Sequence, residues 1–186
     1  RDTARERNAA ARLPPLRWHL LPRRLRRFLV ITIVFALGNS SNTFLLLRVA
    51  GGGDGTQRVL LAYLVYNVTY MICSYPAGTL SDRIGRRKIL AGGYVVYGLV
   101  YFGFANLDHG LSAWTGWALF AAYGVYSGLT DGIEKALVAD LAPPEDRATA
   151  IGLHATAMGI GLLPASLMAG VLWEFVSPAA PFLLGG

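Results

Sequence analysis

The sequence predicts an all-α fold, a polytopic membrane helix bundle with about five complete transmembrane helices and the start of a sixth. Two properties of the chain predict this class. Hydrophobic residues make up 54% of its 186 residues and charged residues only 15%, against about 25% charged residues in ordinary soluble domains. The basic residues also gather in clusters that are separated by long stretches without charge. A single soluble core of this size could not bury so much apolar surface.

The first element is a basic segment at residues 1–27, which holds nine of the seventeen Lys and Arg residues. Its arginines alternate with Trp18 and several leucines, a pattern that could bind nucleic acid or lie on anionic lipid at the inner leaflet. We interpret the segment as a basic cytoplasmic linker that leads into the first helix. It is not a signal peptide, because no short apolar core with a cleavage site precedes the first full span.

Five stretches without charge follow, and each is close to the roughly 20 residues that a transmembrane helix needs. They comprise residues 28–47, 59–81, 89–107, 110–130 and 148–173. None shows the alternation of polar and apolar residues that a transmembrane strand requires. We expect a sixth span to begin at Pro181 and to be interrupted, so we interpret residues 28–186 as the transmembrane bundle of a fragment.

The basic residues also predict the orientation of the spans. The segment 1–27 and the loops around residues 82–88 and Arg147 hold fourteen of the seventeen basic residues. Only Arg48 and Arg58 lie in the opposite loops, an asymmetry that obeys the positive-inside rule. We therefore expect a multi-pass protein of a cell membrane, most simply a bacterial inner membrane, with the linker in the cytoplasm.

A motif links the second and third stretches, where the chain turns at the membrane surface. It reads Gly78-Thr-Leu-Ser-Asp82-Arg83-Ile-Gly85-Arg86-Arg87-Lys88. Gly78 permits a close approach of helices, and Gly85 permits a tight turn. Asp82 at a helix end can pair with a cationic group or with the N-terminus of a neighbouring helix. The motif predicts a latch that holds one conformation and opens in another, whereas the alternative is a basic loop with no gating role.

This motif resembles the G-x-L-x-D-R-x-G-R-R/K signature of the major facilitator superfamily, and every defining position matches. In that family the motif joins helices 2 and 3 and recurs between helices 8 and 9. Because one span lies between the basic segment and the span that carries the motif, the resemblance implies helices 7 to 11 and the start of helix 12. It also implies that an N-terminal six-helix half is the missing partner of this chain.

A second segment at residues 128–152 resembles the end of helix 10 and its cytoplasmic turn in the same family. It fits the pattern A-D-L-x-P-x-x-x-R-x-x-A-x-G, and Pro143 and Pro144 interrupt the helix where it leaves the membrane. Asp140 and Arg147 are candidates for a network with Asp82 and two arginines of the motif. The residues expected to form the cytoplasmic gate are Gly78, Asp82, Arg83, Gly85, Arg86, Arg87, Asp140 and Arg147.

Carboxyl groups within the fourth stretch and its continuation are the first candidates for binding solute or protons, because ionisable groups are costly in lipid. Helical spacing places Tyr123, Ser127, Asp131 and Glu134 on one face. Asp131 lies nine residues before Asp140, or roughly 13 Å from the surface. The two carboxyl groups can carry protons or bind a cationic solute. Alternatively, Asp131 pairs with Lys135 four residues later and only fixes the packing.

Two further polar faces are candidates for the solute pathway. In the second stretch the face comprises Tyr63, Tyr66, Asn67, Tyr70 and Ser74, and its rings suit an amphipathic or cationic ligand. The alternative is a set of hydrogen bonds between helices. In the first stretch, Asn39 and Asn42 belong to a polar block that permits bending beside a water-filled cavity. The family resemblance implies that Tyr94 lies on a peripheral helix, where it packs or faces the lipid interface. We interpret His154 as a packing residue, since a lone His is more often hydrogen bonded than a proton relay.

The leading function is secondary active transport of a small solute by alternating access, coupled to protons and with a weak preference for export. The preference rests on segment 159–170, which loosely resembles the Gly-Pro motif of helix 5 in antiporters, whereas the alternative is that its small residues only permit close helix packing. The alternative is a transporter-like membrane sensor or scaffold without transport. An enzyme or a cofactor site is not expected, because no nucleophile motif, metal set or phosphate loop is present. Nucleic-acid binding is not expected either, because the basic residues lie on one face of the membrane. The predicted pathway residues are Asn39, Asn42, Tyr66, Asn67, Tyr70, Ser127, Asp131 and Glu134.

Overall fold

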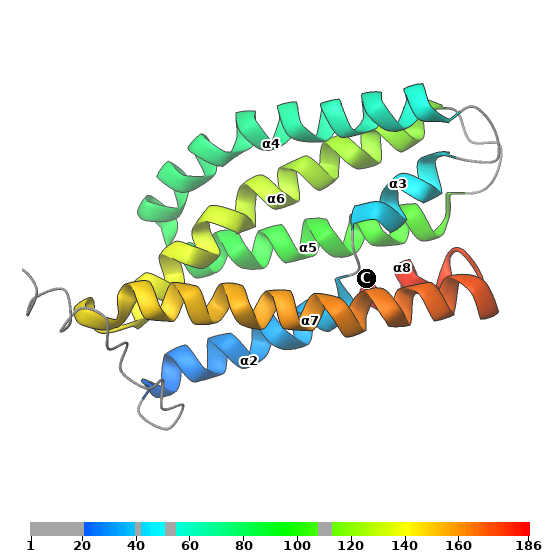
Figure 1. Ribbon diagram of the computed structural model, residues 1–186. Coiled ribbons are helices and arrows are strands. Elements are labelled where there is room, and N and C mark those ends of the chain that lie inside the picture. Colours follow the sequence, from blue (N-terminus) through cyan, green and yellow to red (C-terminus); the bar gives the residue numbers. More distant parts are fainter. Residues whose placement is uncertain (1–20, 40–41, 51–54, 108–112) are drawn as a thin grey trace, which may run out of the picture.

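The computed structural model describes residues 21–39, 42–50, 55–107 and 113–186. Within these residues every regular element is a helix and none is a strand, which confirms the predicted all-α fold (Figure 1). In chain order the elements are α2 (Arg23–Gly38), α3 (Asn42–Ala50), α4 (Thr56–Ile84), α5 (Arg86–Ala105), α6 (Ala113–Leu141), the 3-10 helix η2 (Pro144–Asp146), α7 (Arg147–Phe175) and α8 (Ala180–Gly185). Residues 1–20 of the predicted linker lie outside the described residues.

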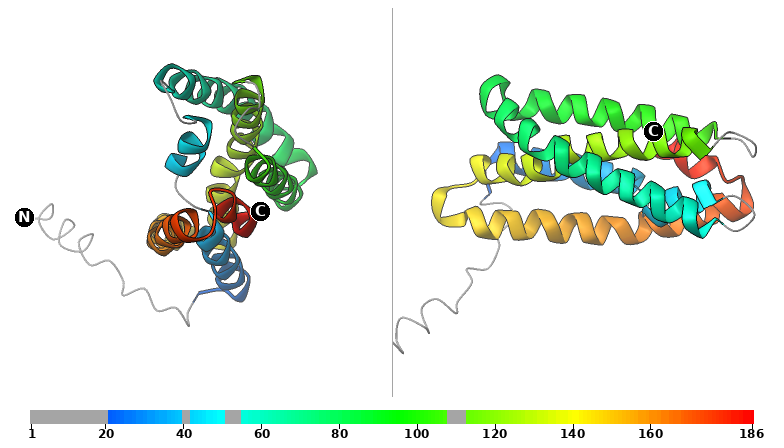
Figure 2. Two further views of the ribbon diagram at one scale, coloured as in Figure 1. Left: turned by 90° about the vertical axis from the view of Figure 1, so that its right-hand side faces the viewer. Right: turned by 90° about the horizontal axis from the view of Figure 1, so that it is seen from above.

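The long helices run side by side along one common direction, as Figure 2 shows from two further sides. α6 packs along α4 and α5, and α7 packs on α2 and α6. The turn between α4 and α5 lies at the same end of the bundle as the turn between α6 and α7 (Figure 1). We call this the motif end, because it holds the residues of the predicted gate. α2 begins at this end at Arg23, five residues before the first predicted span.

Four helical segments of the described chain are long and apolar enough to cross a membrane. They are Arg23–Ala50, Thr56–Ile84, Arg86–Ala105 and Pro144–Phe175. α6 is not among these four segments, although it has 29 residues, as many as α4, and it carries Asp131, Glu134 and Lys135. Since α4 and α5 both pack along it, the helix that contains most of the fourth predicted stretch is shielded by its neighbours.

The outer surface of the bundle is apolar. Large side chains such as Met71 and Leu163 are 68% and 70% exposed. A soluble domain rarely leaves many such side chains in water, whereas lipid chains solvate them well. The exposed apolar side chains of α4 and α7 therefore fit a bundle that is surrounded by lipid.

Glycines permit one tight turn and one close contact between helices in the bundle. Gly85 has a φ of 101°, the single positive φ in the described chain, and this confirms the tight turn expected in the motif. The expected close approach at Gly78 is wrong for the described residues, because a Cβ atom there would have no neighbour within 4 Å. The close contact lies on α6 instead, where a Cβ on Gly124 would stand 2.6 Å from the Tyr66 carbonyl oxygen of α4.

The first predicted span is divided into α2 and α3. α2 ends at Gly38 and α3 begins at Asn42, so the break falls within the polar block. Three tyrosine hydroxyls from α5 and α6 donate hydrogen bonds to its edges. The acceptors are the Gly38 carbonyl oxygen for Tyr97 (3.2 Å), the Asn39 Oδ1 atom for Tyr101 (3.1 Å) and the Asn42 Oδ1 atom for Tyr123 (2.8 Å). The bond from Tyr97 satisfies a backbone carbonyl group at the end of α2, which has no partner within the helix, and the other two bonds satisfy the side-chain amides of Asn39 and Asn42.

Candidate functional site

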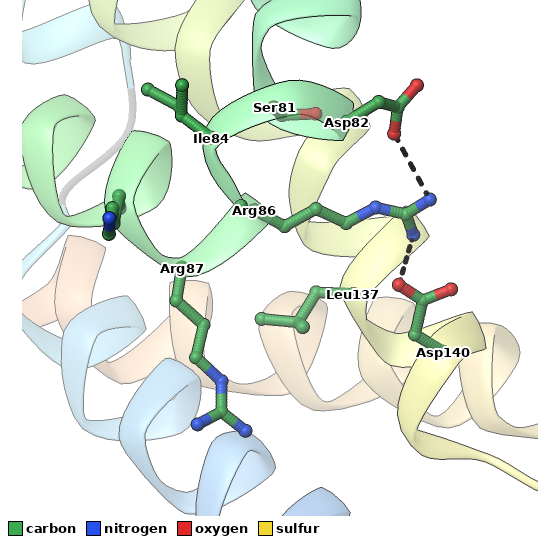
Figure 3. A pocket seen from close by; sticks show the side chains of 9 residues that line it. Ser81, Asp82, Ile84, Arg86, Arg87, Leu137 and Asp140 are labelled. Carbon is green, nitrogen blue, oxygen red and sulfur yellow. Dashed lines mark ion pairs between the residues drawn. The ribbon is translucent and has the colours of Figure 1, made fainter.

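At the motif end, one guanidinium group connects three helices. Arg86 at the start of α5 lies between Asp82 of α4 and Asp140 of α6, as Figure 3 shows. Its Nη1 atom is 2.8 Å from the Asp140 Oδ2 atom, and its Nη2 atom is 3.5 Å from the Asp82 Oδ1 atom. We call these three residues the Arg86 bridge. The Gly85 turn places Arg86 here, because it lets α5 start directly beside the end of α4.

The Arg86 bridge borders an open hollow of about 500 Å³ at the motif end. The side chains of Asp82 and Asp140 are 69% and 53% exposed, and that of Arg86 is 26% exposed. Ion pairs in contact with water contribute only about 0–1 kcal/mol. The Arg86 bridge is thus weak enough to break and reform, which is a property that a latch requires.

The structure joins fewer residues at the motif end than the sequence predicts. Arg83, Arg87 and Arg147 are exposed, and none of them forms an ion pair with any residue that the structure describes. Arg87 turns toward α2 and lines a second hollow with Arg24 and Arg27. Sequence spacing places an arginine on a face of its own helix, but it does not determine which carboxyl group of another helix lies within reach.

A face of tyrosine rings follows α4 beside α6. The rings of Tyr63, Tyr66 and Tyr70 lie one above the next, with centroids 5.9 and 6.2 Å apart. The Tyr66 hydroxyl donates a hydrogen bond of 3.2 Å to the Ser127 Oγ atom of α6. Asn67 instead donates a hydrogen bond to the Tyr63 carbonyl oxygen of its own helix. The bond from Tyr66 to Ser127 is a hydrogen bond between helices, which is the alternative interpretation of this polar face. We call Tyr66, Tyr70, Ser127 and Asp131 the tyrosine face.

Asp131 is exposed one turn beyond Ser127. The ion pair between Asp131 and Lys135, which is the alternative to a role in binding, does not form among the described residues. A carboxylate beside aromatic rings can bind an organic cation, because the ring faces and the negative charge both attract positive charge. The tyrosine face could therefore recognise a cationic or amphipathic solute.

Glu134 does not lie on the tyrosine face, although its spacing predicted that it would. Its side chain is buried between α5 and α7, where its Oε1 atom accepts a hydrogen bond of 2.9 Å from the Tyr94 hydroxyl. Its Oε2 atom is 3.5 Å from the His154 Nε2 atom. The two carboxyl groups of α6 therefore face different surroundings, one exposed and the other enclosed by three helices.

Sequence reasoning missed the contact between Glu134 and His154. A signal for it exists in the chain, because Glu134 and His154 stand ten residues before and ten residues after Pro144. In an antiparallel helix hairpin, residues at equal distances from the turn lie side by side. Pro143 and Pro144 mark this turn, so the contact follows once α6 and α7 are treated as a hairpin.

Comparisons with known proteins identify relatives of this chain. The profile of the Major Facilitator Superfamily matches residues 28–186. The chain is 42% identical over 89% of its length to an uncharacterized MFS-type transporter of Methanocaldococcus jannaschii, of which it covers 42%. It is 35% identical over 67% of its length to the class C tetracycline resistance protein of Escherichia coli, of which it covers 30%.

A third relative is a probable anion transporter of Arabidopsis thaliana chloroplasts, at 27% identity over 63% of this chain and 22% of the relative. No solved structure matches the chain. The chain thus spans less than half of the length of each of these relatives.

Proposed function

This chain belongs to the Major Facilitator Superfamily, and from that premise we propose that it is part of a secondary transporter that carries a small solute across a membrane by alternating access. Members of the family are multi-pass membrane transporters rather than enzymes. The observation that carries the proposal is the Arg86 bridge, a weak contact between three helices at one end of the bundle. Such a contact can stabilise one conformation and release it with little cost.

We assign residues 28–186 to the C-terminal half of the transporter, with helices 7 to 11 and the start of helix 12, and residues 1–27 to the linker between the halves. The N-terminal half completes the pathway. The motif end faces the cytoplasm in this proposal. Its support is the excess of basic residues there, including the four arginines Arg23, Arg24, Arg26 and Arg27 at the start of α2.

The solute binds on the tyrosine face in this proposal. Tyr66 and Tyr70 supply aromatic surface, the buried Ser127 holds the Tyr66 hydroxyl group in place, and the exposed Asp131 carboxylate favours a positively charged group. Asn39 and Asn42 line the pathway at the break between α2 and α3. Protons drive the transport, because α6 offers two carboxyl groups that can take up a proton. Export is the preferred direction, in line with a relative that is named for tetracycline resistance.

Cysteine labelling of the full-length protein in membrane vesicles tests this function. In a Cys73→Ser background without other cysteines, Tyr70→Cys places a thiol on the tyrosine face. Alternating access opens this face to each side in turn, so a membrane-impermeant maleimide should label it from either side. Ile72→Cys is the matched control, since Ile72 is 62% exposed on the other side of α4 and should face lipid.

Labelling of Tyr70→Cys from one side only, under all conditions of pH and solute, would contradict alternating access. It would favour a sensor or scaffold that keeps the fold without transport. Labelling of Ile72→Cys at the same rate would show that the assay does not separate lipid from the pathway, and the assignment of the tyrosine face would then fail.

A further inference from the structure

The bundle contains two ionisable side chains that neither the Arg86 bridge nor the tyrosine face uses. Glu134 of α6 is 7% exposed and His154 of α7 is 4% exposed. They face each other across the helix hairpin, with 3.5 Å between the Glu134 Oε2 and His154 Nε2 atoms. The His154 Nε2 atom has no hydrogen-bond partner among the described residues. Buried polar atoms are nearly always paired, so this atom needs an explanation.

Each neighbouring helix contributes a defined group around the pair. From α5, the Tyr94 hydroxyl donates its hydrogen bond to Glu134. From α2, the Phe28 ring stacks on the His154 ring with an interplanar angle of 11°. On α6 itself, the nearby ionisable groups are Asp131 and Tyr126, and both interact electrostatically with Glu134. Among the described residues His154 is the only basic group within ion-pair distance of Glu134.

The net charge of the pair determines which of its protonation states are stable at this buried position. When neither group carries the proton, the pair consists of a carboxylate and a neutral imidazole and has one negative charge. The carboxylate then faces only the Tyr94 hydroxyl and the edge of the imidazole ring. With two protons, the pair has one positive charge beneath the Phe28 ring. A net charge is costly in such a buried place unless a partner compensates it. A single proton on the Glu134 carboxyl group removes the net charge and places a donor beside the unpaired Nε2 atom of a neutral imidazole.

We infer that Glu134 and His154 form one proton-binding site, with Tyr94 as a positioning residue that fixes the carboxyl group by its hydrogen bond. Binding adds one proton to the pair and changes its charge from −1 to 0, so no other reactant is needed. The site differs from the tyrosine face, where Asp131 is exposed and has no partner of this kind.

The location of the site gives the proton a mechanical consequence. With its proton, the pair holds α6, α7 and α5 together through apolar packing and the Tyr94 hydrogen bond. Without it, the buried carboxylate favours entry of water between α6 and α7. His154 lies seven residues from Arg147 at the start of α7, or roughly 10 Å along the helix from the motif end. This consequence rests on the proposed transport function, whereas proton binding itself does not.

Infrared difference spectroscopy between acidic and basic pH tests the site in the full-length purified protein, and it needs no solute. The C=O band of a protonated carboxyl group should be present in the wild type and lost in Glu134→Gln. In His154→Gln the band should remain, with its titration midpoint moved by more than about one pH unit, because the partner of the carboxyl group is gone. Tyr94→Phe keeps the ring and removes one hydrogen bond, so it should shift the frequency of the band.

Glu145→Gln is the matched control, because Glu145 is an exposed carboxyl group of η2 near the same hairpin turn. It should lose a different carboxyl signal and keep that of Glu134. A band that persists in Glu134→Gln, or a midpoint that does not move in His154→Gln, would overturn the inference. Should Glu134→Gln fail to fold, Glu134→Asp decides in the same way, since its band must change in frequency if Glu134 is the source.

The outcome separates this site from the proposed function. Loss of the band in Glu134→Gln together with no detectable transport by the wild type would support the proton site and reject the transporter. Solute transport by the wild type with an unchanged band in Glu134→Gln would support the transporter and reject the site.

Discussion

At the scale of single residues, Arg86 is the centre of the account of gating. Its guanidinium contacts two carboxylates on two other helices, and a planar fork of donors suits such a double contact better than the single ammonium group of a lysine. All three side chains reach solvent, so the contact can exchange with water. We therefore attribute to it an effect on the balance between conformations rather than on the stability of the fold.

Asp140→Asn tests this attribution, because it removes the charge from the shorter contact of the Arg86 bridge. The melting temperature of the full-length protein should change little, since an exposed ion pair contributes at most about 1 kcal/mol. Labelling of Tyr70→Cys from the motif-end side should become faster, because the latch there is weaker. Glu145→Gln removes an exposed charge outside the bridge and should leave the labelling rate unchanged. Equal rates in wild type and Asp140→Asn would contradict a latch.

Asp131 acts on solute binding rather than on gating, because we propose that its exposed carboxylate contacts the solute directly. For a cationic solute, Asp131→Asn should raise the half-saturating concentration of transport about tenfold, which corresponds to ~1.4 kcal/mol of lost binding. A hydrogen bond to a charged group has this magnitude. Asp131→Glu retains the charge and should lose much less. An unchanged half-saturating concentration in Asp131→Asn would exclude Asp131 from the solute site.

At the scale of elements, the turn between α4 and α5 determines where the Arg86 bridge can form. Gly85 has a φ of 101°, which residues with a side chain rarely adopt. Its amide donates a hydrogen bond of 3.0 Å to the Ser81 carbonyl oxygen, and α5 then begins at once with Arg86. The geometry of one residue thus brings the ends of two long helices together.

Gly85→Ala should lower the free energy of unfolding by about 1–3 kcal/mol, the range for a strained backbone residue. Thermal unfolding in detergent measures this loss. Gly78→Ala is a control on the same motif, because a Cβ atom there meets nothing within 4 Å in the described structure. A loss in Gly78→Ala as large as that in Gly85→Ala would indicate that Gly78 is packed in the full-length protein and would contradict the role given to the turn.

The elements themselves were largely predictable, because charge-free stretches and basic turns define them directly. The Gly85 turn and the helix interruption at Pro143 follow from the known limits of glycine and proline. The directions of side chains between helices were less predictable. Asp131 and Glu134 stand three residues apart on one predicted face, yet one is exposed and the other is buried against α5 and α7. Helical periodicity predicts the direction in which a side chain leaves its own helix. Whether that side chain is buried depends on which other helices pack there, and periodicity does not predict this.

At the scale of the whole molecule, α6 separates three environments. Toward α4 it contributes Ser127 and Asp131 to the tyrosine face. Toward α5 and α7 it contributes Glu134 to the pair with His154, and at its end Asp140 belongs to the Arg86 bridge. A movement of α6 relative to its neighbours would therefore affect the proposed solute, proton and gating sites together. This arrangement offers a physical route by which binding at one site changes the others.

Solute flux in proteoliposomes that contain the full-length protein decides whether the chain is part of a transporter. With an imposed pH gradient, a panel of small organic cations should include compounds that the wild type moves across the membrane, and flux should cease when the gradient is collapsed. Asp131→Asn should reduce flux of the same compounds at low concentration. If the folded, inserted protein moves no solute of any charge class in either direction, the chain is not part of a transporter and the account fails.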